Sequence, residues 1–94
     1  PQYPSVNRDI ALLVDKKVPS KSLEETIVRT GGKLLDRVVL FDYYDDQSLG
    51  GNKRSLAWSL TFQSTDKNLK NKAVDQLVGK ILYQLEKQHN AIQR

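Results

Sequence analysis

Hydrophobic and polar residues alternate most regularly in residues 55–63, which read Ser-Leu-Ala-Trp-Ser-Leu-Thr-Phe-Gln. Because successive side chains of a β-strand point to opposite faces, this segment predicts a strand with one large apolar face and one small, polar face. The apolar face carries Leu56, Trp58, Leu60 and Phe62. This pattern is typical of an antiparallel sheet that helices cover on one side only, which leaves the other side open to water or to a ligand.

Three other segments also favour strands. Residues 4–14 start at a proline and end in an apolar run that suits a buried, central strand. Residues 34–44 are rich in β-branched and aromatic side chains, and the period of two places Asp42 and Tyr44 on one face of that strand. Residues 91–94 are assigned to a short final strand.

A first helix is expected near residues 20–30. Leu23 and Ile27 lie one turn apart and form its buried stripe. Its start is expected at Ser20 or Ser22, and Ser22 with Glu25 has the spacing of a capping box, in which each residue bonds a free backbone N–H of the first turn.

Gly31 and Gly32 are expected to end this helix, because glycine adopts the left-handed conformation without a steric clash. A second, longer helix follows a polar connection, and Asn90 is expected as its left-handed carboxyl cap. Its apolar residues repeat with the helical period, at Val74, Leu77, Val78, Ile81, Leu82 and Leu85.

The predicted order of elements is β-α-β-β-α-β. Right-handed crossovers place both helices on one face of a four-stranded antiparallel sheet. This is the α+β, ferredoxin-like split βαβ fold, with the first and third strands in the centre. A chain of 94 residues has room for one such domain, residues 1–94.

The composition narrows the class of protein. The chain is 38% hydrophobic and 28% charged, and its longest apolar runs have about five residues, far fewer than the roughly 20 that cross a bilayer. We therefore expect a soluble domain without a membrane partner or a secretory signal. The absence of cysteine excludes disulfides and thiolate metal sites and suits a cytoplasmic protein. Because the chain lacks methionine and starts with proline, we expect it to be a piece of a longer polypeptide.

Side chains for catalysis or metal binding are sparse. The single histidine, His89, has no second histidine or cysteine beside it and suits a surface position at a helix carboxyl end. Asp45 and Asp46 could bind a hard cation, although adjacent acids in a loop are usually solvated. Gly50 and Gly51 precede a strand, whereas a phosphate loop precedes a helix. We expect no catalytic residue, metal or cofactor in this domain.

The open sheet face offers a candidate site. Ala11, Asp42, Tyr44 and Ser55 can meet there, and they supply a small gap, a carboxylate, an aromatic ring and a hydroxyl. Such a set suits one unstacked nucleobase, because Tyr44 can stack on it and Asp42 can accept hydrogen bonds from the N–H groups of guanine. The formal charge of +4 also favours a polyanionic partner. On spacing alone, an alternative stays open in which Tyr44 covers a sheet edge and Asp42 starts a turn.

Several motifs together resemble one known family, the bacterial ferredoxin-fold anticodon-binding domain that closes the beta subunit of phenylalanyl-tRNA synthetase. The resemblance covers essentially the whole chain. The motifs are Pro4-Ser5-x-x-Arg8-Asp9-Ile10-Ala11, Gly31-Gly32, Leu40-Phe41-Asp42-x-Tyr44, Lys53-Arg54-Ser55-Leu56-Ala57 and Ala91-x-x-Arg94. One departure is Lys70-Asn71-Lys72-Ala73, where the family usually has acidic residues; Asn71 is still expected to cap the helix.

The resemblance implies a partner and a role for the site. It implies that the domain binds the anticodon loop of phenylalanine tRNA and holds the first anticodon base, a guanine, on Ala11, Asp42, Tyr44 and Ser55. It also implies a parent enzyme, an α2β2 tetramer that uses ATP, magnesium and phenylalanine and has its active site in the alpha subunit. The chain would then come from the C-terminus of the beta subunit, with tRNA and not DNA as its nucleic-acid partner.

Three cations are candidate RNA-phosphate contacts. Lys53 and Arg54 flank Ser55 and are the preferred ones, each neutralising at most one charge. Arg8 could contact a phosphate or pair with an acid to hold the turn after Pro4, and the structural role is favoured.

Two other classes of function stay open. A ferredoxin-like small-molecule regulatory domain would bind its ligand at a dimer interface and would have no salt-dependent affinity for RNA. A protein-interaction domain would lose nothing when Tyr44 or Asp42 is replaced.

Overall fold

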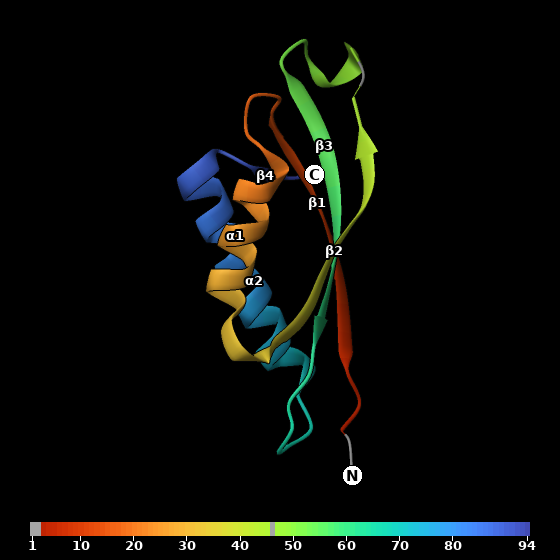
Figure 1. Cartoon of the computed structure of the whole chain (residues 1–94), viewed down its shortest axis with the longest axis vertical. Helices are drawn as coiled ribbons and strands as arrows, with labels where there is room; N and C mark the ends of the chain where they lie inside the picture. Colours follow the sequence, from red (N-terminus) through yellow and green to blue (C-terminus); the bar gives the residue numbers. More distant parts are fainter. Residues whose placement is uncertain (1–2, 46) are drawn as a thin grey trace.

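Figure 1 shows the fold, a computed structural model that describes residues 3–45 and 47–94. The elements follow the predicted order, with two short 3-10 helices at Gly32–Leu34 and Gln47–Leu49. They are β1 (Val6–Asp15), α1 (Ser20–Gly31), β2 (Leu35–Tyr44), β3 (Lys53–Phe62), α2 (Asn71–His89) and β4 (Ile92–Gln93).

The four strands form one antiparallel sheet in the order β2-β3-β1-β4. The first and third strands are therefore central, which confirms the ferredoxin-like prediction. Both helices lie on the same side of the sheet, and the β2–β3 hairpin extends beyond them at the top of Figure 1. The other face of the sheet, called the open face below, has no helix over it. No helix in the described ranges has the length and apolar character needed to cross a membrane.

The core lies between the helices and the covered face of the sheet. The alternation of β3 is confirmed, because its four large apolar side chains are at most 1% exposed. Leu23 and Ile27 of α1 and Ile81 and Leu85 of α2 are completely buried against them. Burial of apolar surface on this scale is the main driving force for one helix layer to pack on one sheet face.

The start of α1 differs from the prediction. The helix begins at Ser20, and Pro19 occupies the N-cap position without a side-chain hydrogen bond, so both the serine cap and the capping box of Ser22 with Glu25 are wrong. The φ of Pro19 is −66° and its ψ is 142°, which leaves Ser22 inside the first turn. There the backbone N–H of Ser22 donates to the Pro19 carbonyl over 3.0 Å.

The glycine end of α1 is confirmed. Gly32 has a φ of +63° and stands at the carboxyl cap, where a residue with a Cβ would be strained. Gly31 is needed for a different reason: a Cβ there would lie 2.6 Å from Cδ2 of Leu35.

At the two ends of α2, one prediction fails and one holds. Lys70 occupies the N-cap position, so the expected Asn71 cap is wrong. The side-chain oxygen of Asn71 instead accepts a hydrogen bond from Nη2 of Arg8 at 3.2 Å. Asn90 is left-handed with a φ of 54°, as expected, and turns the chain back towards the sheet.

An irregularity in β2 decides which residues reach the open face. Leu40 lies opposite Trp58 on the covered face, and the next paired residue, Asp42, lies opposite Ala57. Phe41 is the extra residue of a β-bulge between them. Regular alternation from Leu40 would turn Asp42 to the covered face, so the bulge is what places Asp42 and Tyr44 on the open face.

Candidate functional site

A pocket on the open face collects the four sequence-predicted residues. Its volume is about 320 Å³, at the lower end of the ~300–1,000 Å³ range that small-ligand pockets occupy. The lining residues come from three strands and from the residue after β4: Ala11, Asp42, Tyr44, Ser55, Ala57 and Arg94.

The sheet register explains why these residues meet. Asp42, Ala57 and Ala11 form one row across β2, β3 and β1. Tyr44 and Ser55 are partners in the neighbouring row. The two alanines form a low floor between taller side chains, so the face is hollow at this point.

The polar groups of the pocket differ in their exposure. Ser55 is only 6% exposed, whereas Tyr44 is 43% exposed. Oδ1 of Asp42 accepts the backbone N–H of Tyr43 over 2.9 Å, which helps to orient the carboxylate. A carboxylate has about four acceptor positions, so this one bond leaves Asp42 able to accept hydrogen bonds from a ligand.

Arg94 and Ala57 line the pocket although the sequence did not single them out as site residues. The backbone N–H of Arg94 donates to the Ala11 carbonyl over 2.8 Å and so continues the ladder that β4 forms with β1. The guanidinium carbon lies 5.6 Å from the centre of the Tyr44 ring. The available signals were the alternation of β3 for Ala57 and the expected final strand for Arg94.

Lys53 and Arg54 lie on opposite faces of the sheet. Lys53 shares a face with Ser55, but Arg54 lies opposite Val14, which is buried on the covered face. Nη2 of Arg54 donates to the Val18 carbonyl over 2.6 Å, and its guanidinium carbon lies 5.7 Å from the centre of the Tyr43 ring. Arg54 therefore holds the β1–α1 connection, away from the pocket.

Arg8 also lies on the covered face, opposite Leu60. Its Nε forms an ion pair with Oδ1 of Asp75 over 3.0 Å, and its Nη2 donates to Asn71 over 3.2 Å. Its Nη1 donates to the carbonyl of Asn7 over 2.9 Å. These contacts tie β1 to the first turns of α2, whereas the sequence-based alternative was a bond that holds the turn after Pro4.

The acidic loop after β2 forms local contacts. Oδ1 of Asp45 lies 3.0 Å from Nζ of Lys16, and the Tyr43 hydroxyl donates to Oδ2 over 3.1 Å. The hydrogen bond from Lys16 holds the pKa of Asp45 below its ordinary value. Asp46 lies outside the described residues. Within the described part of the chain, no three His, Cys, Asp or Glu side chains are grouped so that they could hold a metal ion.

His89 contacts another helix and is only partly exposed. Its Nε2 lies 2.8 Å from Oγ1 of Thr26, which is buried in α1. Its position in the last turn of α2 agrees with the expectation. Its main structural effect is to join the two helices.

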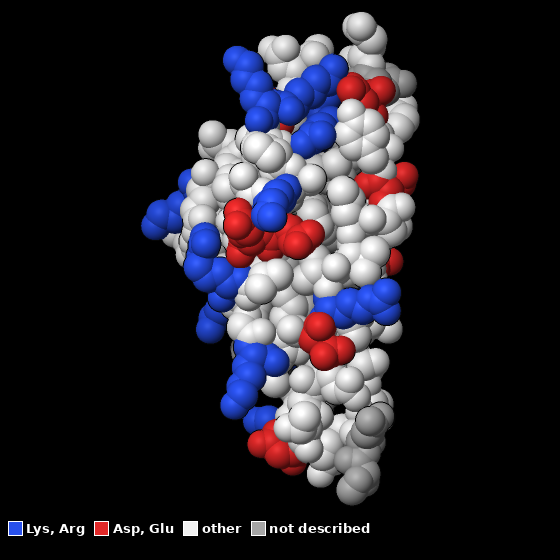
Figure 2. All heavy atoms as spheres, viewed as in Figure 1, with Lys and Arg blue, Asp and Glu red and all other residues white. Residues whose placement is uncertain are grey.

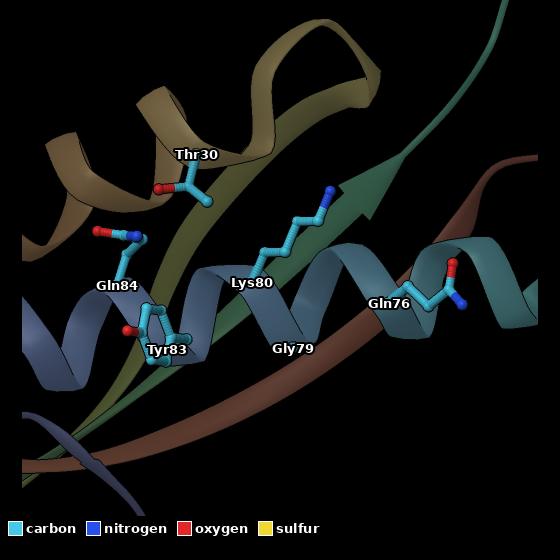
Figure 3. Close-up of a pocket in the computed structure, with 6 residues that line it drawn as sticks. All are labelled: Thr30, Gln76, Gly79, Lys80, Tyr83 and Gln84. Carbon is cyan, nitrogen blue, oxygen red and sulfur yellow. The ribbon is translucent and has the colours of Figure 1, made fainter.

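A larger hollow of about 520 Å³ lies on the helix layer. Figure 3 shows that Thr30 reaches it from α1 and that the other five residues come from α2. Lys80 is the one charged residue among the six, and no predicted site residue lines this hollow. It offers no combination of groups with an evident chemical role.

The face of the molecule shown in Figure 2 carries charges of both signs. In Figure 2, Lys and Arg side chains are spread along the molecule, and acidic side chains lie between them. In this view, the excess of positive charge is not gathered into one stripe. The candidate site is defined by the side chains that line the pocket.

The chain matches one family model, and the three relatives described here carry the same protein name. The family model described as "Ferredoxin-fold anticodon binding domain" matches residues 1–94. The chain is 42% identical, over all its 94 residues, to proteins named phenylalanine–tRNA ligase beta subunit from Listeria monocytogenes serovar 1/2a and from Bacillus subtilis strain 168. It is 40% identical over 84 residues, 89% of its length, to the protein of that name from Carboxydothermus hydrogenoformans. The chain spans 12%, 12% and 10% of the lengths of these relatives.

Proposed function

The chain belongs to the ferredoxin-fold anticodon binding domain family, and we propose that its open-face pocket binds one base of a tRNA anticodon. The observation that carries this proposal is the convergence of Asp42, Tyr44 and Ser55 on a single pocket over a floor of alanine. Those groups match the needs of an unstacked base, which are a flat partner, hydrogen-bond acceptors and space.

The proposed ligand within the anticodon is guanine. Guanine presents the N1–H and the 2-amino group along one edge, and the two oxygens of Asp42 can accept both hydrogen bonds at once. Tyr44 would stack on the face of the base, and Ala11 would leave room for it beside the strand. The Ser55 hydroxyl can donate or accept at the inner end of the pocket.

We propose phenylalanine tRNA as the RNA, because the relatives are phenylalanine–tRNA ligase beta subunits. In this proposal the domain is a C-terminal part of such a beta subunit in an α2β2 enzyme of the cytoplasm, and it supports aminoacylation by holding the anticodon. ATP, magnesium and phenylalanine would be used at an active site in the alpha subunit. No step in the present domain involves them.

Lys53 is the best supported of the proposed phosphate contacts, because it lies on the open face beside the pocket. The guanidinium groups of Arg8 and Arg54 are engaged on the covered face. Their contacts favour structural roles, and the prediction that they bind phosphate needs a direct experiment.

The test is a titration of the 94-residue chain with the anticodon stem-loop of phenylalanine tRNA at low and physiological salt. Two changes should each cost about 1–3 kcal/mol of binding free energy, as expected for a lost base contact: guanine to adenine at the first anticodon position, and Tyr44→Ala. Tyr83→Ala is the matched control, because this tyrosine is 61% exposed on the helix layer.

The proposal fails if the wild-type chain and Tyr44→Ala bind both loops equally well. Salt-dependent binding of that kind would indicate only a basic surface. Absence of salt-dependent RNA binding would favour a small-molecule or protein-interaction domain.

A further inference from the structure

Two opposite charges share the pocket without pairing with each other. Asp42 and Arg94 both line it. In the described part of the chain, ion pairs join Arg8 to Asp75 and Lys16 to Asp45, and none involves Asp42 or Arg94. A carboxylate accepts hydrogen bonds and a guanidinium donates them, so the two groups can bind a donor edge and an acceptor edge of the same ligand.

The sheet holds these two residues at opposite ends of one row. Asp42 lies opposite Ala57 on β3, Ala57 lies opposite Ala11 on β1, and Arg94 bonds the Ala11 carbonyl. Neighbouring strands are about 4.8 Å apart, so three spacings separate the two backbones by roughly 14 Å. Asp42 and Arg94 line the pocket from these two ends, and its volume of about 320 Å³ has room for one planar base.

The backbone of Arg94 is anchored, whereas its side chain can change its contact. Its N–H is anchored to Ala11, and its guanidinium lies over the ring of Tyr44 at 5.6 Å. A cation–π contact at an exposed ring is weak. A base that stacks on Tyr44 can therefore replace this contact, and the guanidinium can move to the edge of the base.

We propose that Arg94 is a second guanine-selecting residue, which donates hydrogen bonds to O6 and N7 while Asp42 accepts from N1–H and the 2-amino group. Arginine pairs with these two acceptors of guanine in a forked arrangement that lysine does not reproduce. Adenine has a 6-amino donor in place of O6, which the arginine donors would meet unfavourably. This inference rests on the proposed function, because it assumes that the pocket holds a base.

The experiment changes individual hydrogen-bonding groups of the base. Stem-loops with guanine, adenine, inosine or 7-deazaguanine at the first anticodon position are titrated against the wild-type chain, Arg94→Ala and Arg94→Lys. Inosine lacks the 2-amino group that Asp42 would bind, and 7-deazaguanine lacks the N7 that Arg94 would bind. Arg37→Ala is the matched control, because it removes an exposed arginine from the same sheet face, opposite Thr61 and outside the pocket.

The expected result is a coupling between Arg94 and N7. With the wild-type chain, 7-deazaguanine should bind about tenfold more weakly than guanine, as expected for a lost hydrogen bond to a charged group. With Arg94→Ala the two bases should bind equally, while inosine should still bind more weakly than guanine. Arg94→Lys should retain the salt dependence and lose most of the N7 effect, and Arg37→Ala should behave like the wild type.

Two results would overturn the inference and leave the proposed function standing. One is equal binding of guanine and 7-deazaguanine by a wild-type chain that still rejects adenine. The other is an equal loss for all four loops in Arg94→Ala, with the N7 effect unchanged, which would indicate a phosphate contact. Equal binding of guanine and adenine by the wild-type chain would instead overturn both proposals.

Discussion

Nε of Arg8 on β1 lies 3.0 Å from Oδ1 of Asp75 on α2, although 67 residues separate them in the chain. The Arg8 side chain is 29% exposed and the Asp75 side chain 64% exposed. The pair therefore joins the sheet to the second helix at a partly hydrated position. Such a contact is worth little individually, and it is the alternation of β1, with Arg8 opposite Leu60, that keeps the arginine on the covered face.

Replacing this arginine should affect stability and leave RNA binding unchanged. Arg8→Met should lower the free energy of unfolding by about 0.5–1 kcal/mol, because the ion pair and the hydrogen bond to Asn71 are lost while the packing of the side-chain stem is kept. Urea unfolding measures this change, with Asp75→Asn as the partner variant. A reduced salt dependence of RNA binding in Arg8→Met would show instead that Arg8 contacts a phosphate.

Replacing Lys53 should affect RNA binding, whereas replacing its neighbour Arg54 should affect stability. Lys53→Met should reduce the slope of log affinity against log salt by about 0.7, the value for one contact to a single-stranded phosphate. Arg54→Met should leave that slope unchanged and should destabilise the fold by about 1–3 kcal/mol, because the Val18 carbonyl loses its donor. Equal effects of both variants on the slope would contradict their assignment to different faces.

Asp42→Asn tests the acceptor side of the pocket. An amide has an NH2 donor in place of one carboxylate oxygen, and this donor would face an N–H of the guanine edge, so affinity for the guanine loop should fall about tenfold. The melting temperature should stay close to that of the wild type, since Asp42 is exposed. Unchanged affinity for guanine together with a lower melting temperature would make Asp42 a structural residue.

Two glycines should respond oppositely to alanine. A Cβ at Gly31 would lie 2.6 Å and 2.8 Å from side-chain atoms of Leu35, whereas one at Gly79 would meet no atom within 4 Å. Gly31→Ala should therefore destabilise the domain by about 1–3 kcal/mol through overpacking. Gly79→Ala should stabilise α2 by about 0.5–1 kcal/mol, because glycine is a poor helix former. Thermal unfolding of the two variants checks both signs.

The sequence predicted the longer elements because the strongest of them have a clear period. The alternation of β3 and the helical repeat of α2 each select a single structure, and the topology follows from their order. The helix starts were wrong because a cap depends on where the backbone leaves the helical conformation. Proline at position 19 and lysine at position 70 hold those extended positions without any side-chain bond, so no capping side chain marks either helix start.

The site was predicted less completely, for two physical reasons. The alternation of a strand predicts that Asp42 and Tyr44 share a face, but the bulge at Phe41 decides which face that is. No simple sequence pattern predicts this bulge. The position of Arg94 depends on β4, which is too short to give a periodic signal. Arg54, by contrast, carried a usable signal: it precedes Ser55 in a strand and must point to the opposite face.

The shortness of β4 has a consequence for how the pocket responds to its ligand. Two residues pair with β1, so detaching β4 breaks few hydrogen bonds and requires less free energy than unfolding the three longer strands. The amide of Arg94 should therefore exchange with solvent hydrogen faster than the amides of β3. A base held between Asp42 and Arg94 would slow this exchange, so part of the binding free energy would be used to order the last strand of the sheet.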